Sequence, residues 1–382
     1  MKREIIEMGK LERLIITCGG TGGHFYPGLS IAREFQSQGG KVLLLLSGVN
    51  SEAQAATAAK YNIEAVVLPV MPAWNRHLLR FISGALKGWM KARKVIREFA
   101  PQVILGMGSF AMTPVLLSGW FAGIPLALHD GNARIGRGNR IFSRFAKVLG
   151  AGFPPVNPDK CRCRIADTGM PVRPELLNAE KLDRNEALKK LNELFDCDLK
   201  EDLTTILIFG GSQGAAVFNK IIPEALLKCG DEEFQVLHLC GKGKKLDAEK
   251  LYCNADFPVL LLESSDKMEY FLAAADAVFC RSGGSTLAEL ALFGKGAYLI
   301  PYPSAAEGHQ LDNAEYFERN GAAKIIINDE LTTEKVCGLL KEEICSNSAV
   351  IAERGKAAAQ LARPDAAKLM LEEISAIIVE KN

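Results

Sequence analysis

The chain has 382 residues, of which 48% are hydrophobic and 24% are charged. This length favours two domains, and the composition is typical of a globular protein rather than of a disordered or fibrous one. The net charge is only +1, but residues 1–150 carry +11 and the remainder carries −10. The first part of the chain is therefore expected to meet an anionic partner, either a membrane surface or nucleic acid.

No leader peptide, membrane span or metal cluster is predicted. The first ten residues are charged, and the apolar run 14–17 is too short for a signal sequence. Residues 107–129 are uncharged, but prolines and glycines interrupt them, which favours a helix, a turn and a buried strand over a span. Of the ten cysteines only Cys161 and Cys163 are close in sequence, so free thiols in a reducing cytoplasm are expected.

The first half opens with a pattern typical of a βαβ unit that has a glycine-rich first turn. An apolar strand at residues 14–17 precedes Cys-Gly-Gly-Thr-Gly-Gly-His at 18–24, a helix over 26–38 and a second strand over 41–47. The glycine spacing differs from the dinucleotide fingerprint. Glycines let a backbone approach a diphosphate closely, and His24 lies where a general base could act. The alternative is a structural histidine.

Residues 72–97 combine seven basic residues with no acidic one, and the apolar residues at 78, 82, 85, 86, 89 and 96 have the spacing of one side of a helix. An aromatic and basic helix of this kind suits an interface with anionic lipid. The residues assigned to that interface are Trp74, Arg80, Phe81, Lys87, Trp89 and Lys91. The alternative is a helix whose apolar side is core and whose lysines are solvated. Nucleic acid is a weaker partner, because no known nucleic-acid module surrounds the helix.

Strand ends supply the other candidate groups. A strand over 126–129 ends in His129 and Asp130, with Asn132 just beyond, and ligands gather at the carboxyl ends of parallel strands. In the second half, a strand over 204–209 leads into Gly-Gly-Ser-Gln-Gly at 210–214, and a helix is expected from 215. This repeats the plan of the first half and predicts two α/β units that face each other across a cleft.

A further strand is predicted over 276–280, followed by a turn at 282–285 and a helix over 286–293. Amides of the turn 282–285 would point along a helix dipole toward an anion. One helical turn later, Glu289 can accept hydrogen bonds from sugar hydroxyls, and a loop with His309, Gln310 and Asn313 follows. The pattern indicates a nucleotide-sugar site. The alternative is a generic strand-to-helix turn with a solvated Glu289.

Taken together, these motifs resemble the bacterial MurG glycosyltransferases, which transfer N-acetylglucosamine from UDP-N-acetylglucosamine to lipid I, an undecaprenyl-pyrophosphoryl-muramoyl-pentapeptide. The segments that carry the resemblance are 19–28, 105–108, 123–125, 169–173, 210–215, 280–283 with Glu289, and 321–324. The resemblance implies an α/β fold of the GT-B type, with two Rossmann-like domains. An acceptor-binding and membrane-facing domain would span 1–172 and regain a closing helix at 361–382, and a UDP-sugar domain would span 173–360.

By motif position, the resemblance implies a set of substrate-binding residues: Thr21, Gly22, Gly23, Asn132, Arg173, Ser212, Gln213, Gly214, Ser265, Ser285, Thr286, Leu287, Glu289 and Gln310. The family often has His-Glu-Gln-Asn where this chain has His129-Asp-Gly-Asn132, which leaves the role of Asp130 open. Gly284 and Ser285 also replace residues that are often Ala and Leu.

The reaction expected from the resemblance is an inverting displacement that makes lipid II for peptidoglycan synthesis at the cytoplasmic face of the inner membrane. No cofactor and no metal ion are predicted for the reaction. The alternatives are a UDP-N-acetylglucosamine 2-epimerase of similar architecture, a UDP-sugar sensor, and a glycosyltransferase with another glycolipid acceptor. Protein partners and oligomeric state are not predicted.

Overall fold

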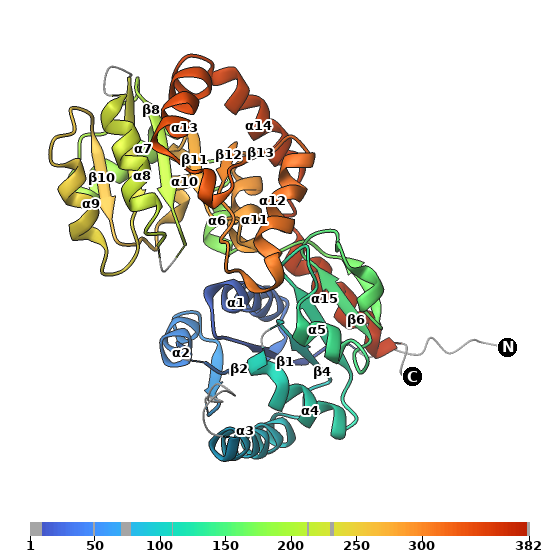
Figure 1. Cartoon of the computed structure of the whole chain (residues 1–382). Coiled ribbons are helices and arrows are strands. Elements are labelled where there is room, and N and C mark those ends of the chain that lie inside the picture. The colour runs from blue at the N-terminus through green and yellow to red at the C-terminus, as the bar shows by residue number, and fades with distance from the viewer. Residues whose placement is uncertain are drawn as a thin grey trace. The chain divides into compact units, whose positions relative to one another are not determined.

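The computed structural model describes residues 10–48, 50–69, 78–108, 110–211, 214–229 and 233–379. The chain divides into two compact units (Figure 1). The first unit comprises Met1–Arg173 and Arg363–Asn382, and the second comprises Pro174–Ala362. Each unit is an α/β structure around a parallel sheet.

The first unit's sheet has the strand order β3-β2-β1-β4-β5-β6-β7, and every neighbouring pair among these described strands is parallel. The strands are β1 Arg13–Cys18, β2 Lys41–Leu46, β3 Glu64–Val67, β4 Val103–Gly106, β5 Leu126–Asp130, β6 Val148–Ala151 and β7 Arg164–Asp167. The helices are α1 Gly22–Ser37, α2 Ser51–Ala59, α3 Leu78–Phe99, α4 Thr113–Phe121, α5 Arg137–Phe142 and α15 Ala366–Val379, with 3₁₀ turns η1 Phe110–Met112 and η2 Pro158–Lys160.

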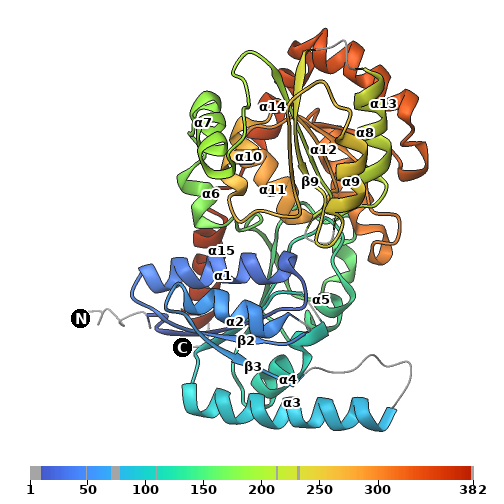
Figure 2. The same ribbon diagram turned by 90° about the vertical axis from the view of Figure 1, so that its left-hand side faces the viewer.

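Both faces of this sheet are buried, because successive side chains of a strand point to opposite faces. Leu14 and Ile16 of β1 join a core under α1 and α15, whereas Ile15 joins a core under α3 and α4. Figure 2 shows α1 and α3 on opposite sides of the sheet. The closing segment belongs to this unit through packing on α1 and through ion pairs of Arg164 with Glu373 and of Arg363 with Asp167.

The second unit's sheet has the order β10-β9-β8-β11-β12-β13 and is also parallel over its described pairs. The strands are β8 Thr204–Phe209, β9 Phe234–Leu239, β10 Val259–Leu262, β11 Ala277–Cys280, β12 Ala297–Leu299 and β13 Ala323–Ile325. The helices are α6 Pro174–Asn178, α7 Arg184–Phe195, α8 Phe218–Lys228, α9 Lys245–Tyr252, α10 Met268–Ala274, α11 Gly284–Leu292, α12 His309–Arg319, α13 Thr333–Leu339 and α14 Ser348–Gln360. Shorter turns are the 3₁₀ turns η3 Ala306–Gly308 and η4 Asn328–Glu330 and the π-helix η5 Leu340–Cys345.

In each sheet the strand order reverses beside the unit's first strand, between β1 and β4 and between β8 and β11. Open parallel sheets bind ligands at this position, beyond the carboxyl ends of the strands. The turn predicted at residues 18–24 follows β1, and the turns predicted at 210–214 and 282–285 follow β8 and β11. The fold therefore brings the predicted glycine turns to the two positions where such sheets bind ligands.

Two helices begin earlier in the structure than the sequence predicted, and one begins later. The helix predicted over 26–38 starts at Gly22, and that predicted over 286–293 starts at Gly284, whereas the helix expected from 215 starts at Phe218. Glycine lowers helix propensity in an interior, but a helix's first turn needs few of its own amide bonds. Residues 107–129 form η1, α4 and β5 as predicted, and no helix of the described chain is both long and apolar enough to cross a membrane.

Candidate functional site

In the first unit, the glycine turn after β1 places the amino end of α1 at the carboxyl edge of the sheet. Gly19 has φ +125°, and a Cβ there would lie 2.6 Å from the carbonyl oxygen of Ser47, so only glycine fits this passage past β2. Thr21 is the N-cap of α1, and its carbonyl accepts bonds from the amides of His24 and Phe25 at 3.3 and 3.2 Å. Gly22, Gly23 and His24 thus form the first helical turn.

His24 is half-buried and lies against the end of the neighbouring strand β4. Its Cε1 is 3.6 Å from the position that a Cβ on Gly108 would occupy, and the carbonyl of His129 is 3.4 Å from the same point. Burial lowers the pKa of His129, and the charge of nearby His24 lowers it further, against the opposing effects of Gly169 and Asp130. Since His129 Nε2 lies 3.0 Å from the Gly169 carbonyl, that nitrogen carries the proton of a neutral ring.

Asp130 holds together the loop that follows β5. Its buried carboxylate accepts hydrogen bonds from the amide of Gly136 at 2.8 Å, from Asn139 Nδ2 at 2.9 Å and from the amide of Asn132 at 3.2 Å. Asn139 Nδ2 also donates to the His129 carbonyl at 2.9 Å. Two backbone amides of the loop and the side chain of Asn139 on α5 thus occupy this carboxylate, and its place in the fold is a structural one. Sequence reasoning did not identify Asn139, because the partners of its side chain lie on β5.

Arg173 lies at the end of the first unit's main segment, where its guanidinium stands 5.1 Å from the ring centre of Tyr26. Tyr26 projects from α1, one turn after Gly22, and its ring is partly exposed. A guanidinium over an aromatic face is an attractive cation–π arrangement. The contact brings Arg173 next to the turn that carries His24.

In the second unit, the turn after β8 contains two predicted residues, Ser212 and Gln213, that lie outside the described part of the chain. Gly214 is described and has φ +64°; a Cβ there would lie 2.1 Å from the carbonyl oxygen of Cys240. The amide of Gly214 donates to the carbonyl of Gly211 at 2.9 Å. This end of the turn is therefore packed against the residue that follows β9.

The turn after β11 leads into α11, whose N-cap is Gly283. Ser282 is fully buried and donates from Oγ to the Gln310 carbonyl at 2.7 Å, while Asn313 Nδ2 donates to the Ser282 carbonyl at 3.0 Å. These two bonds fasten the start of α12 to the start of α11. Gln310 uses its Oε1 to accept the amide of Tyr302 at 2.9 Å, which leaves its Nε2 as the side chain's donor group.

The candidate residues on α11 differ in exposure. Thr286 and Glu289 are half-buried, whereas Leu287 is fully buried, so Leu287 offers a ligand only its backbone. The Ser285 Oγ is buried without a hydrogen-bond partner among the described residues. Burial, reinforced by the negative charge of Glu289, raises the pKa of the Cys280 thiol, so this cysteine is a neutral core residue.

Ser265 and Arg281 each follow a strand of the second unit's sheet. Ser265 follows β10, two strands from β8, and its Oγ accepts the Lys267 amide at 3.0 Å. Arg281, which sequence reasoning did not single out, donates to the carbonyls of Ile300 and Pro301 at 3.0 and 3.1 Å and lies 5.5 Å from the ring centre of Tyr302. Its partners come from the end of β12, so only the folded chain reveals its bracing role.

The predicted membrane residues have mixed positions. Trp74 is outside the described chain, and for Arg80 and Phe81 only the helical backbone of α3 is described. Lys87 is exposed and Trp89 half-buried, while Lys91 donates from Nζ to the Val67 carbonyl at 2.7 Å. The neighbouring apolar side chains of Leu86 and Met90 are 53% and 59% exposed. Exposed apolar and cationic side chains thus alternate along α3.

More apolar side chains are exposed on the same unit near a group of cations. Phe110, Ile141 and Phe121 are 58%, 50% and 70% exposed. Phe110 and Ile141 line a shallow pocket of about 400 Å³ whose other lining residues are all basic: Arg137, Arg140, Arg144, Lys160 and Arg162.

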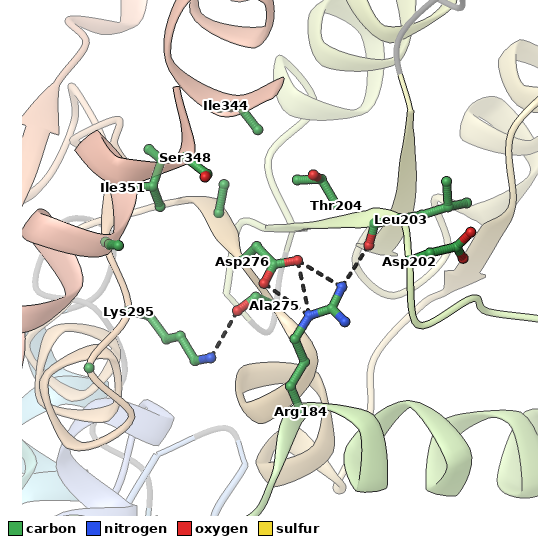
Figure 3. A pocket seen from close by; sticks show the side chains of 14 residues that line it. Arg184, Asp202, Leu203, Thr204, Ala275, Asp276, Lys295, Ile344, Ser348 and Ile351 are labelled. Atoms are coloured by element: carbon green, nitrogen blue, oxygen red, sulfur yellow. Dashed lines mark hydrogen bonds and ion pairs between the residues drawn. The ribbon is translucent and has the colours of Figure 1, made fainter. Parts of the chain in front are cut away.

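A separate pocket of about 370 Å³ opens in the second unit at the amino ends of β8 and β11, the edge opposite the glycine turns (Figure 3). Arg184 forms an ion pair with Asp276 at 2.9 Å and donates to the Leu203 carbonyl at 2.6 Å. Lys295 donates to the Ala273 and Ala275 carbonyls at 3.0 and 2.8 Å, and burial lowers its pKa to about 8. Arg184 and Lys295 thus bind backbone carbonyls beside β8 and at the end of α10, and their role is structural.

Comparison with known proteins identifies both halves of the chain. Residues 14–150 match the glycosyltransferase family 28 N-terminal domain, and residues 205–370 match its C-terminal domain. The chain is 35% identical over 365 residues to a UDP-N-acetylglucosamine–N-acetylmuramyl-(pentapeptide) pyrophosphoryl-undecaprenol N-acetylglucosamine transferase of Desulforamulus reducens, covering 93% of this chain and 95% of the relative. The chain belongs to the MurG family of glycosyltransferases.

Other similarities agree with this family. A like-named transferase of Halothermothrix orenii is 34% identical over 352 residues, 87% of this chain and 90% of the relative. The crystal structure of Acinetobacter baumannii MurG is similar with a TM-score of 0.74 and 25% identity, covering 97% of this chain and 99% of that one. The predicted GT-B fold is thereby confirmed. A UDP-GlcNAc 2-epimerase from Neisseria meningitidis shares that fold, with a TM-score of 0.70 at 15% identity over 97% and 100% of the two chains.

Proposed function

We propose that this chain is the hexosyltransferase that moves N-acetylglucosamine from UDP-N-acetylglucosamine onto the muramoyl 4-hydroxyl of lipid I, giving lipid II for peptidoglycan synthesis. The observation that carries the proposal is similarity to transferases of this name over nearly the full length of both proteins. Attack by the acceptor hydroxyl opposite the departing UDP inverts the anomeric centre. Two demands follow: removal of the hydroxyl proton, and stabilisation of the charge on the diphosphate.

The second unit would bind the donor. Backbone amides of the turns 210–214 and 282–285 suit an anionic diphosphate, because each turn precedes a helix. Glu289 would accept bonds from the ribose hydroxyls, and the Nε2 of Gln310 would donate to the sugar. We assign further donor contacts to Ser265, Ser285 and Thr286, and to the backbone of Leu287, whose buried side chain is out of reach.

The first unit would supply the acceptor side and the proton acceptor. His24 is our candidate for the base because it is half-buried in the first turn of α1, at the switch between β1 and β4. Thr21, Gly22, Gly23 and Asn132 stand at the same sheet edge, and Arg173 beside Tyr26 is suited to a phosphate charge.

We also assign this unit to the cytoplasmic face of the inner membrane, as a peripheral contact. The support is the exposed pair Leu86 and Met90 beside Lys87 on α3, together with the basic pocket that contains Phe110 and Ile141. Apolar side chains surrounded by cations bind at the headgroup region of anionic bilayers. Nucleic acid is not proposed as a partner.

The test is transfer of labelled N-acetylglucosamine from UDP-N-acetylglucosamine to purified lipid I. Label in a product of the mass of lipid II is expected, and its absence with an active family enzyme as positive control contradicts the proposal. Incubation of the donor alone serves as the second arm. Formation of a 2-epimer of the donor sugar without acceptor would show that the chain is an epimerase, like the UDP-GlcNAc 2-epimerase that shares its fold, and not the proposed transferase.

A further inference from the structure

Behind the glycine turn of the second unit lies a row of buried polar side chains that the proposed reaction does not use. His238 on β9 is fully buried, with Nδ1 3.1 Å from the hydroxyl of Tyr252 and Nε2 3.1 Å from Oδ1 of Asn219. Asn219, on the first turn of α8, donates from Nδ2 to the carbonyl of Cys240 at 2.9 Å. Tyr252 is the last residue of α9. The row therefore joins α9, β9 and α8.

The hydrogen bonds in this row can run in only one direction. The Cys240 carbonyl accepts, so Asn219 must present its NH₂ there and its Oδ1 to His238. Because Oδ1 also accepts, His238 must carry its proton on Nε2, and its bare Nδ1 must accept from the Tyr252 hydroxyl. Burial lowers the pKa of His238 to about 4, which keeps the ring in this neutral form. Each donor in the row thus has one acceptor, ending at Cys240.

The Cys240 carbonyl is also the atom against which Gly214 packs. A Cβ at Gly214 would come within 2.1 Å of that oxygen and within 2.8 Å of the Cα of Gly241. The Cys240 amide is fixed on its other side by the Leu262 carbonyl at 2.9 Å. A shift of the Cys240 carbonyl would therefore move the Gly214 end of the turn with it, and α8 begins four residues after Gly214, at Phe218.

We propose that Tyr252, His238 and Asn219 are positioning residues that support UDP binding by fixing the Cys240 carbonyl, against which the Gly214 end of the turn after β8 packs. The inference rests on the proposed function, because it takes the turn to be part of the UDP site. Preorganised backbone donors bind and stabilise charge best when they need no reorganisation. Tyr252, His238 and Asn219 would therefore increase the affinity for UDP by supporting these donors, without contacting the ligand themselves.

The experiment measures UDP binding by calorimetry, the donor and acceptor KM, and thermal stability of the full chain. Tyr252→Phe removes only the hydroxyl that starts the row, and Asn219→Asp keeps the side chain's shape but cannot donate to Cys240. The control is Tyr298→Phe, which removes another buried tyrosine hydroxyl of the second unit, one that donates to Glu343 at 3.0 Å and lies outside the row.

We expect Asn219→Asp to raise the UDP Kd and the donor KM about tenfold or more, and Tyr252→Phe by about threefold to tenfold, with the acceptor KM unchanged. Tyr298→Phe should lower the melting temperature while leaving the UDP Kd as it is. If the Asn219→Asp chain does not fold, the UDP Kd of Tyr252→Phe compared with that of Tyr298→Phe tests the inference.

Two results would overturn the inference alone: UDP binding at the wild-type Kd by a Tyr252→Phe enzyme, or an equal loss of affinity in Tyr298→Phe. Failure of the unaltered chain to bind UDP would overturn the proposed function and the inference with it.

Discussion

His24 is the residue to which we assign removal of the proton from the acceptor hydroxyl. It follows a glycine turn that only glycine can make at Gly19, and it faces Gly108 at the end of the adjacent strand. The sequence indicated a base at this position because a histidine directly follows the turn. The start of α1 at Gly22 was not predictable from propensity, since it depends on how the turn packs against β2.

Replacing His24 with Ala or Gln tests its role as the base. Loss of a general base slows the chemical step by about 10² to 10⁴, so we expect kcat to fall by at least about 10² while the UDP Kd stays near the wild-type value. Single-turnover transfer to lipid I, with UDP binding measured in parallel, checks both numbers. A His24→Ala enzyme with wild-type kcat would assign the proton to another group.

Buried histidines also give the chain a pH dependence whose sign follows from burial. The folded pKa of His238, about 4, lies below its ordinary value of 6.5, so the unfolded chain binds the proton more readily than the folded chain. The stability that this neutral ring contributes is present above pH 6.5 and is lost as the pH falls toward 4. Burial acts in the same direction on His129.

We therefore expect β9 to open with a free energy about 2 kcal/mol lower at pH 5 than at pH 7.5 on account of His238. Hydrogen exchange of the β9 amides, corrected for the intrinsic effect of pH on exchange, measures this. In His238→Gln, which does not titrate, the difference between the two pH values should shrink by that amount. An unchanged difference would mean that folding does not lower the pKa of His238.

At the scale of the elements, the strands and the glycine turns were the predictable part. Continuous apolar runs such as Thr204–Phe209 become central strands because both faces of a parallel sheet are covered. The hydrogen bonds that position the turns were not predictable, because their partners are distant in sequence. Ser282 with Gln310, Arg281 with Ile300 and Asn219 with Cys240 all join residues brought together by sheet order.

Contacts with residues distant in sequence also distinguish two glycines that look alike in the sequence. Gly214 and Gly243 both have positive φ, +64° and +73°, but a Cβ at Gly214 would strike the Cys240 carbonyl, whereas nothing lies within 4 Å of one at Gly243. Gly243→Ala therefore meets only the strain of a left-handed backbone, about 1 to 2 kcal/mol. Gly214→Ala adds a backbone clash that the turn must move to relieve.

We expect Gly214→Ala to weaken UDP binding by at least about tenfold and Gly243→Ala to leave the Kd unchanged, with both losing some thermal stability. Calorimetric titration of UDP into each variant measures the difference. Equal affinities would show that the turn accommodates a methyl group without losing its ligand geometry, and would detach Gly214 from the diphosphate site.

For the whole molecule, the difference in net charge between the two parts of the sequence is also a difference between the two structural units. The excess of positive charge lies in residues 1–150, which belong to the first unit. Helical periodicity in residues 72–97 indicated the basic helix α3, but it placed Leu86 on the apolar side of the helix, and the structure leaves that residue 53% exposed. Lys91, predicted to face lipid, also donates to the Val67 carbonyl.

These placements make Lys87 on α3 and Arg144, which lines the basic pocket beyond α5, the better probes of membrane contact. Reversing both charges, Lys87→Glu with Arg144→Glu, should reduce binding to vesicles that contain anionic lipid. Each charge near such a surface contributes about 1 kcal/mol, and each reversal removes an attraction and adds a repulsion. We therefore expect co-sedimentation to fall by at least about tenfold at low salt and the difference to narrow as salt screens the charges.

The matched control reverses two exposed lysines of the second unit, Lys341→Glu with Lys356→Glu, which changes the net charge of the chain by the same amount. If vesicle binding depended only on total charge, both double variants would lose it equally. If the first unit carries the contact, only Lys87→Glu with Arg144→Glu should lose it, and its rate with detergent-dispersed acceptor should stay near that of the unaltered chain, because neither residue is assigned to the chemistry. Retained co-sedimentation of that variant would remove this surface from the membrane.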